Sequence, residues 1–242
     1  MYYCCGITDK GIMKHNEDAY MIDGKVITEG NIDFMVKAPF IAAVSDGVSG
    51  ENYGEIASKK CLEFLSQIDF NSETDLKKAV LNVHHNLYDY GIQDNKTKNM
   101  QATLCAIAID ENDNLNTVNV GDSRMYRYRR GNIKQISRDQ SLVQLLYEEK
   151  KHHVHKNIIF PVMGNISAEP KPDIKNLNEI MKYGDLILIC SDGLSDYVSC
   201  TEMEDILDLP AKLPKRLERL VKLAIDNGSQ DNITIIALCC YD

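Results

Sequence analysis

The sequence predicts an α+β fold in one domain. Short strand-like runs are followed by two helical segments, further strands, one more helix and a closing strand. Strands and helices do not alternate regularly, as they would in a parallel α/β sheet. The strand-like segments in the middle are joined by Asp-Asn and Gly-Asn turns, which is typical of an antiparallel meander. No linker or internal repeat divides the chain, so we predict a single domain over residues 1–242.

The first half of the chain contributes strands and two helices. Apolar, strand-like runs cover residues 2–7, 19–22 and 40–44. The helical segments have apolar residues three or four positions apart, namely Ala57, Cys61, Phe64, Leu65 and Ile68, then Leu76, Ala79, Val80, Val83, Leu87 and Tyr90. Ser72, with Asp75 three residues later, predicts the start of the second helix.

The second half contributes the meander, a last helix and the closing strand. Its strand-like runs cover residues 102–109, 115–120, 125–129, 133–136, 186–190 and 233–240. The last helix carries Leu213, Leu217, Leu220, Val221 and Ala224 on one face. A short helix is expected at 141–151, before the basic run 150–156 with its three histidines. We interpret that run as a solvated loop rather than a metal site, because no nearby carboxylate or cysteine completes a ligand set.

Composition excludes several classes of function. With 27 basic and 36 acidic residues, the net charge of −9 disfavours duplex nucleic acid as a partner. No apolar run approaches the roughly 18–20 residues of a membrane span, and the N-terminal segment lacks the pattern of a signal peptide. We therefore expect a cytoplasmic protein with no membrane partner. No pattern indicates oligomerisation, so a monomer is expected.

Three aspartates occur in the same sequence context. Asp46, Asp192 and Asp231 each lie beside a turn residue at the border of an apolar strand. Strand ends hold carboxylates rigidly, and carboxylate oxygens are the ligands that Mg²⁺ and Mn²⁺ prefer. Glu17 and Asp18 add two carboxylates beside another strand. A single Asp-Gly pair usually indicates only a turn, but the recurrence favours a cation site.

These residues resemble the metal-dependent serine/threonine protein phosphatases of type 2C, in their bacterial-type branch. The resemblance extends over almost the whole chain in the order typical of that family. The matching segments are Thr8-Asp9-Lys10-Gly11, Asn16-Glu17-Asp18, Ser45-Asp46-Gly47-Val48-Ser49-Gly50, Ala102-Thr103, Val120-Gly121-Asp122-Ser123-Arg124, Arg138-Asp139, Ser191-Asp192-Gly193-Leu194 with Asp196, and Gly228-Ser229-Gln230-Asp231-Asn232-Ile233-Thr234. One such segment is weak evidence, whereas the ordered set is specific.

The resemblance implies a fold, an activity and partners. The fold is a four-layer α-β-β-α sandwich, with two central antiparallel sheets flanked by helices. The activity is hydrolysis of phosphoserine and phosphothreonine in proteins, by attack of a metal-bound hydroxide. The implied cofactors are two ions of Mn²⁺ or Mg²⁺, with room for a third metal ion beside them. The partners are phosphorylated proteins, the substrates of serine/threonine kinases in signalling.

The resemblance also implies a role for each acidic residue. Asp46 would bridge two metal ions and contribute to catalysis. Asp192 and Asp231 would complete the first ion's ligands, while Glu17 and the Gly47 carbonyl would hold the second. Asp18 would orient a metal-bound water. Asp122, together with Asp192, matches the position that holds a more labile third ion in bacterial members.

The sequence departs from the family pattern at the position that binds substrate phosphate. Met13 stands where most members carry an arginine. If the chain is extended here, side-chain alternation directs Lys14 away from the Glu17 side and His15 towards it. His15 is therefore the candidate substitute for substrate binding.

Other departures concern histidines and the flap. Val48 replaces a histidine of eukaryotic members, Gln140 replaces another after Asp139, and the flap near 141–161 is shortened. The alternative function is a catalytically weak pseudophosphatase, or a regulatory binding module that retains the fold. Met13 motivates this alternative, and the retained metal carboxylates argue against it.

Overall fold

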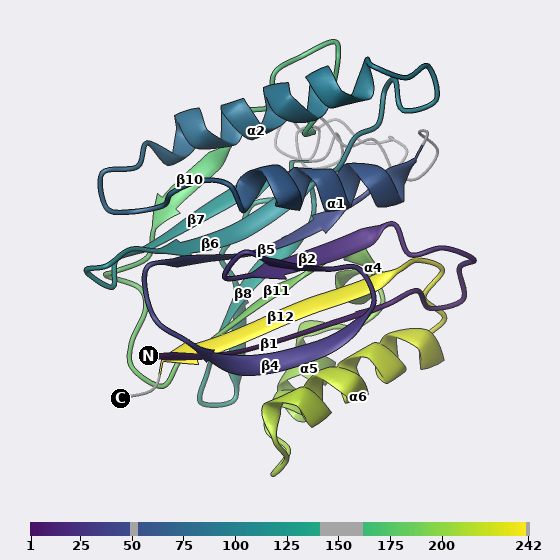
Figure 1. The fold of residues 1–242 in the computed structure, drawn as a ribbon. Coiled ribbons are helices and arrows are strands. Elements are labelled where there is room, and N and C mark those ends of the chain that lie inside the picture. The colour runs from purple at the N-terminus through teal and green to yellow at the C-terminus, as the bar shows by residue number, and fades with distance from the viewer. Residues whose placement is uncertain (49–52, 141–161, 241–242) are drawn as a thin grey trace, which may run out of the picture.

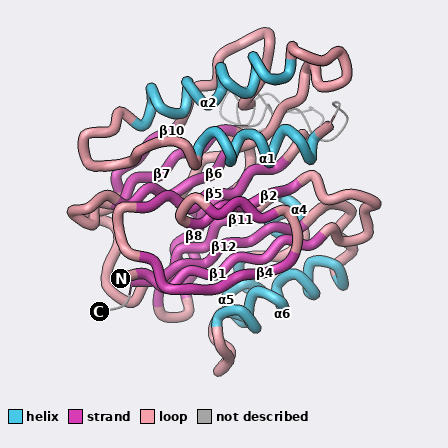
Figure 2. Tube along the Cα trace, in the orientation of Figure 1, coloured by secondary structure: helices cyan, strands magenta, loops and turns pink. Residues whose placement is uncertain are grey.

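The computed structural model describes residues 1–48, 53–140 and 162–240. Two six-stranded sheets lie face to face, with helices on the outer face of each (Figures 1 and 2). Helices α1 (Gly54–Leu65) and α2 (Leu76–Gly91) cover one sheet. Helices α5 (Cys200–Leu207) and α6 (Leu213–Asp226) cover the other. The predicted α+β class and the α-β-β-α sandwich are confirmed.

Every strand pairing recorded within the two sheets is antiparallel. The first sheet has the order β4 (Gly30–Val36), β1 (Tyr2–Asp9), β12 (Ile233–Cys240), β11 (Leu186–Cys190), β8 (Arg124–Arg129) and β9 (Asn132–Gln135). The second has the order β10 (Asp173–Asn176), β7 (Leu115–Val120), β6 (Leu104–Ile109), β5 (Phe40–Asp46), β2 (Asp18–Ile22) and β3 (Lys25–Ile27). In the first sheet, the early strands β4 and β1 lie at one edge, and β1 joins them to the late strand β12.

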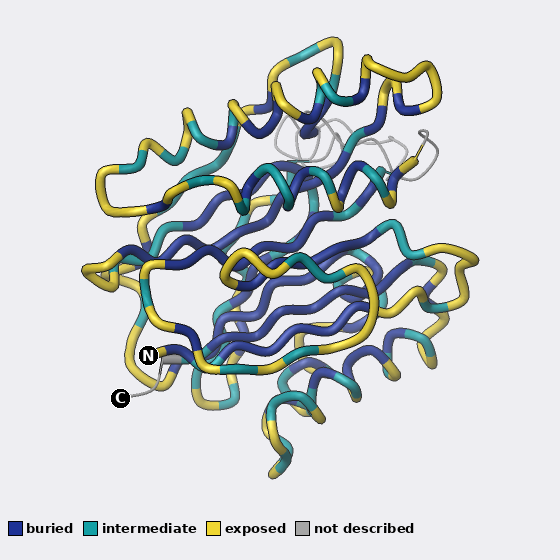
Figure 3. Tube along the Cα trace, in the orientation of Figure 1, coloured by how far each residue is buried: buried dark blue, intermediate teal, exposed yellow. Residues whose placement is uncertain are grey.

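The central strands are apolar on both sides, and they are buried because each sheet is covered on both faces (Figure 3). In β1, Cys4 packs in the core between the sheets, whereas its neighbour Cys5 packs against the helices. The same alternation in β12 places Ile236 between the sheets and Ile235 under the helices. Two helix-to-sheet cores and one sheet-to-sheet core therefore stack through the molecule.

The second helix begins one turn later than its predicted capping residue. Asp75 is the N-cap, and its Oδ1 accepts a 3.0 Å hydrogen bond from the Lys78 N–H. Ser72, the predicted start, instead donates its hydroxyl to the Glu111 carboxylate at 2.5 Å. The Ser72 prediction is wrong because both residues suit a cap, and the spacing alone does not separate them.

Five elements were not predicted, and each is short or polar. They are β3, β4, β10, α4 (Asp192–Ser195) and α5. The start of α5 did carry a readable signal, because Ser199 and Glu202 form a capping box. The helix expected at 141–151, the basic run 150–156 and the shortened flap near 141–161 lie outside the described residues.

The extended chain expected through Met13 to His15 is wrong. A turn closes there, in which the Met13 N–H donates to the Lys10 carbonyl at 3.1 Å, and β2 begins only at Asp18. Residues 10–17 therefore form a loop, which we call the 10–17 loop. Within the described ranges, no helix combines the length and apolarity needed to cross a bilayer.

Candidate metal centre

The predicted carboxylates converge from both sheets at one end of the sandwich. Asp18 and Asp46 are directly opposite in the pairing of β2 with β5, which puts their Cβ atoms about 5 Å apart. Asp192 begins α4, two residues after β11 ends, and Asp231 lies two residues before β12 begins. Because β11 and β12 are neighbours, these two aspartates also lie side by side.

Burial and mutual repulsion perturb the first pair. Asp18 is only 2% exposed, and burial raises its pKa to about 7. The charges of Asp192 and Asp231 contribute to this rise, so the carboxylates of the two sheets lie close enough to repel one another. The Ser191 hydroxyl opposes the shift by donating to Asp18 Oδ2 at 2.7 Å. The pKa of Asp46 is raised well above its usual range, first by burial and then by Asp18 and other carboxylates.

The remaining aspartates show the same pattern. Burial and then the Asp231 charge raise the pKa of Asp192 to about 6. Burial and then the Asp192 charge raise the pKa of Asp122 to about 7. Burial is also the main cause of the raised pKa of Asp231. Asp122 Oδ1 and Asp192 Oδ1 are buried without a hydrogen-bond partner among the described residues.

This arrangement fits divalent cations by its chemistry. The cluster offers hard oxygen donors, and cations would both relieve the repulsion and satisfy the two unpartnered oxygens. Among the described residues, no three acidic, histidine or cysteine side chains form a ready-made metal-binding group. The fit therefore rests on donor type, charge and unpartnered oxygens rather than on coordination geometry.

Glu17 and Gly47 lie together beside the start of α1. The Gly47 N–H donates to the Glu17 carbonyl at 3.1 Å. A Cβ on Gly47 would fall 2.3 Å from the Gly54 carbonyl oxygen, so only glycine fits. A Cβ on Gly54 would in turn fall 3.0 Å from Glu17 Oε2. The close approach of these glycines brings the Glu17 carboxylate against the end of β5.

Several supporting residues had no role in the sequence prediction. Thr103 accepts the Asp46 N–H at 3.0 Å and shares a 2.8 Å hydrogen bond with the Ser123 hydroxyl. Asn232, which is 2% exposed, bonds three backbone groups of the 10–17 loop. All three residues lie inside the matching sequence segments. Ser123 and Asn232 each directly follow a predicted carboxylate, whereas Thr103 carries no signal beyond its place in a matching segment.

An ion pair supports the far side of the centre. Arg124 Nε donates to both oxygens of Asp139, at 3.2 and 2.9 Å, and Arg124 NH1 donates to the Ser195 carbonyl at 3.1 Å. These hydrogen bonds connect the start of β8 to the end of α4.

Gln140, in place of the family histidine, donates through its amide to the carbonyls of Asn119 and Lys171. Gln140 therefore has a bonding role within the fold.

The residues considered for phosphate binding all lie in the exposed part of the 10–17 loop. The side chain of Met13 is 38% exposed, and Lys14 and His15 are also exposed. The His15 carbonyl is held by Asn232 Nδ2 at 3.0 Å. Because this segment is not a strand, alternation no longer separates Lys14 from His15, so Lys14 becomes a candidate beside His15.

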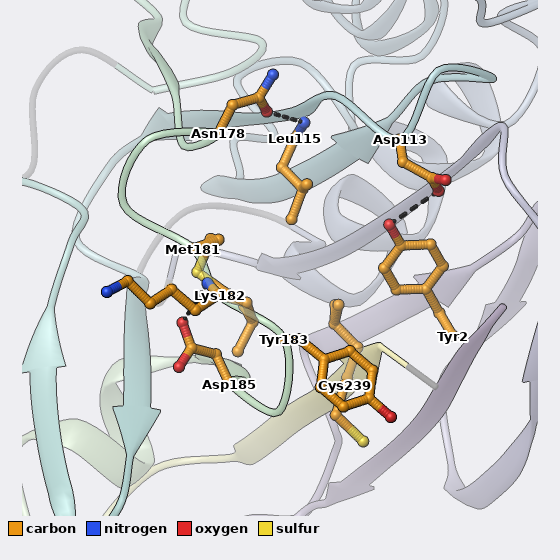
Figure 4. Close-up of a pocket in the computed structure, with 11 residues that line it drawn as sticks. Tyr2, Asp113, Leu115, Asn178, Met181, Lys182, Tyr183, Asp185 and Cys239 are labelled. Carbon is orange, nitrogen blue, oxygen red and sulfur yellow. Dashed lines mark hydrogen bonds between the residues drawn. The ribbon is translucent and has the colours of Figure 1, made fainter. Parts of the chain in front are cut away.

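A cavity of about 230 Å³ opens at the opposite end of the sandwich (Figure 4). It is lined by the far ends of β1 and β12, including Tyr2 and Cys239. Its polar groups are bonded to one another: the Tyr2 hydroxyl donates to Asp113 at 3.0 Å, and the Lys182 N–H donates to Asp185 at 2.8 Å. The cavity shares no lining residue with the carboxylate cluster.

Known proteins resemble this chain in sequence and in fold. The family model described as protein phosphatase 2C matches residues 29–232. The serine/threonine phosphatase stp of Listeria welshimeri is 31% identical over 95% of this chain and 92% of its own length. A serine/threonine phosphatase of S. agalactiae superposes with a TM-score of 0.83 at 26% identity, covering 100% of both chains. The catalytic domain of the phosphatase PstP, solved with two manganese ions, has a TM-score of 0.78 at 26% identity and the same coverage.

Proposed function

Because the chain belongs to the protein phosphatase 2C family, we propose that it hydrolyses phosphoserine and phosphothreonine in proteins. The observation that carries this proposal is the convergence of Asp18, Asp46, Asp192 and Asp231 from two sheets onto one buried cluster. The family is one of enzymes, and its relative PstP was solved with manganese. The residues of this chain suit the same ions.

The proposed ligands follow from position. Asp46 would bridge two ions of Mn²⁺ or Mg²⁺, with Asp192 and Asp231 on one and Glu17 and the Gly47 carbonyl on the other. Asp122 would hold a third ion together with Asp192, and its unpartnered Oδ1 supports that role. When bound, the ions would lower the pKa of a shared water towards about 7, supply hydroxide at neutral pH and shield the phosphoryl oxygens.

The protein's own residues would orient the reaction. The Ser191 hydroxyl holds Asp18 Oδ2 in place, and from this position Asp18 would orient the attacking water and accept its proton. Thr103 fixes the backbone of Asp46 at both its N–H and its carbonyl. Inversion at phosphorus by water needs no covalent intermediate, so no serine or cysteine nucleophile is required.

We test the proposal with a phosphothreonine peptide and added Mn²⁺. Hydrolysis is expected with Mn²⁺, none with chelator, and at least about a 100-fold loss in Asp192→Ala, since even outer residues of metal sites cost 10–100-fold. Asp89→Ala, an exposed aspartate on α2, is the matched control and should retain activity. Absent hydrolysis with metal, or an unchanged Asp192→Ala, contradicts the assignment.

The same assay separates the alternative of a pseudophosphatase or binding module. That protein would bind Mn²⁺ and phosphopeptide without turnover. The phosphatases to which this chain is similar favour an enzyme over a binding module.

We further propose that the chain acts as a monomer on substrates of serine/threonine kinases. Size-exclusion chromatography with light scattering tests the first of these points, and a mass near 27.3 kDa is expected.

The loss of the family arginine predicts a gain by replacement. Met13→Arg should lower KM for a phosphothreonine peptide about 10-fold or more with little change in metal requirement, because hydrogen bonds to charged groups contribute about 1.5–3 kcal/mol. Met35→Arg adds the same charge at another exposed methionine, on β4, and should leave KM unchanged. An unchanged KM in Met13→Arg would show that Lys14, His15 or another group already holds the phosphate.

A further inference from the structure

Asn232 is the side chain that connects the 10–17 loop to the two aspartates on the other side of the metal centre. Its Nδ2 donates to the carbonyls of Lys10 and His15, at 2.9 and 3.0 Å. Its Oδ1 accepts the Glu17 N–H at 2.7 Å. The amide orientation follows from these partners, since carbonyls can only accept and an N–H can only donate. One buried side chain therefore holds both ends of the loop.

The backbone of Asn232 is fixed from the opposite side. Its N–H donates to Asp231 Oδ1 at 2.7 Å. Its carbonyl oxygen lies 1.9 Å from where a Cβ on Gly193 would stand, so the residue after Asp192 packs directly on it. The 10–17 loop also approaches this backbone, because a Cβ on Gly11 would fall 2.8 Å from the Asp231 carbonyl oxygen. Asn232 thus contacts the backbone beside Asp192 and Asp231 as well as the loop that carries Glu17.

We infer that Asn232 is a positioning residue, which sets Glu17 and the phosphate-facing part of the 10–17 loop relative to Asp192 and Asp231. It acts through backbone groups and is not itself a ligand. In the absence of its amide, the N–H of Glu17 and two loop carbonyls would lose their buried partner. The loop would then bond to water in several conformations, and Glu17 would no longer be held at one distance from the other carboxylates.

A matched variant separates positioning from general stability. Asp110 is 4% exposed and also makes three side-chain hydrogen bonds, to Asn112 N, Asn114 N and Asn114 Nδ2. It lies just beyond Ile109, at the end of β6 away from Thr103 and Asp46. Asn232→Ala and Asp110→Ala should both lower Tm. Only Asn232→Ala should change the metal site.

The test is Mn²⁺ binding by calorimetry at 25 °C, with KM for a phosphothreonine peptide as a second measurement. Asn232→Ala should bind Mn²⁺ about 10–100-fold more weakly than wild type and raise KM, whereas Asp110→Ala should bind within about twofold. Asn232→Asp sharpens the comparison and serves if the alanine variant does not fold. Its added negative charge alone would tighten Mn²⁺ binding. If Asn232 acts by positioning, Asn232→Asp should instead bind Mn²⁺ more weakly. A carboxylate oxygen would replace Nδ2 and could not donate to the carbonyls of Lys10 and His15.

Wild-type affinity in Asn232→Ala, or tighter binding in Asn232→Asp, would overturn the inference. The inference rests on the proposed function for its metal centre, but the two fail differently. A wild-type protein that binds Mn²⁺ without hydrolysing phosphopeptide would contradict the phosphatase assignment. The binding comparison would still decide the role of Asn232.

Discussion

Asp46→Asn is expected to lower Mn²⁺-dependent hydrolysis at least about 100-fold, and at the same time to raise the Tm of the metal-free protein. Asp46 is surrounded by other carboxylates, and burial and their charges raise its pKa well above the usual range. A raised carboxyl pKa means that the ionised form is disfavoured in the folded state. Replacing the ionisable carboxyl group by a neutral amide should therefore stabilise the fold at neutral pH. Activity and stability should therefore change in opposite directions.

Thermal unfolding with and without Mn²⁺ measures the second effect. At an Mn²⁺ concentration 100 times its Kd, the wild type should gain about 2.7 kcal/mol, and Asp46→Asn should gain much less. Asp89→Asn, an exposed aspartate on a covering helix, should change neither measurement. A metal-free Asp46→Asn with a lower Tm than wild type would show that the carboxylate cluster does not destabilise the fold.

Gly193→Ala should destabilise the protein by at least about 3 kcal/mol, at the upper end of the usual range for overpacking. The added Cβ would fall 1.9 Å from the Asn232 carbonyl oxygen, a backbone atom that cannot rotate away. Relief requires β12 and α4 to separate, which also displaces Asp192 and Asp231. Loss of Mn²⁺ binding should therefore accompany a fall in Tm of about 6–12 °C for a chain of this size.

Gly24→Ala is the control for this substitution. Gly24 has a φ of +74° and no atom within 4 Å of the added Cβ, so it incurs only backbone strain of about 1–2 kcal/mol. It should lower Tm less than Gly193→Ala and leave Mn²⁺ binding intact. Equal effects of the two substitutions would contradict a steric origin.

Most of the sandwich could be predicted because its strands are strongly apolar. The runs that became β5, β11 and β12 bury both faces, so their continuous apolar character identified them without help from tertiary contacts. β3 and β4 were not predicted, because β3 has only three residues and β4 alternates exposed and partly buried positions. Their strand conformation depends on pairing with β2 and β1.

The gathering of the aspartates at one end of the sandwich was predictable for a similar reason. Asp46, Asp192 and Asp231 border apolar strands, and a strand end fixes a carboxylate. The shape of the loop in front of Asp18 could not be predicted, because the loop is held by Asn232, which lies more than 200 residues away in the chain. No local pattern in residues 10–17 records that contact. The assumed extension at Lys14 and His15 was wrong for this reason.

The pairing of β1 with β12 has a consequence for how the protein is made. The two strands pair over their full length, from Tyr2 with Cys240 to Asp9 with Ile233, in the interior of the first sheet. During synthesis at about 5–20 residues per second, the N-terminal strand must wait roughly 10–45 seconds for its partner. Asp231 lies just before β12, so the proposed metal centre cannot be complete in a nascent chain until this part of the sequence has been made. Until then the edge of β1 that pairs with β12 is open, and an open strand edge is a template for pairing with another chain.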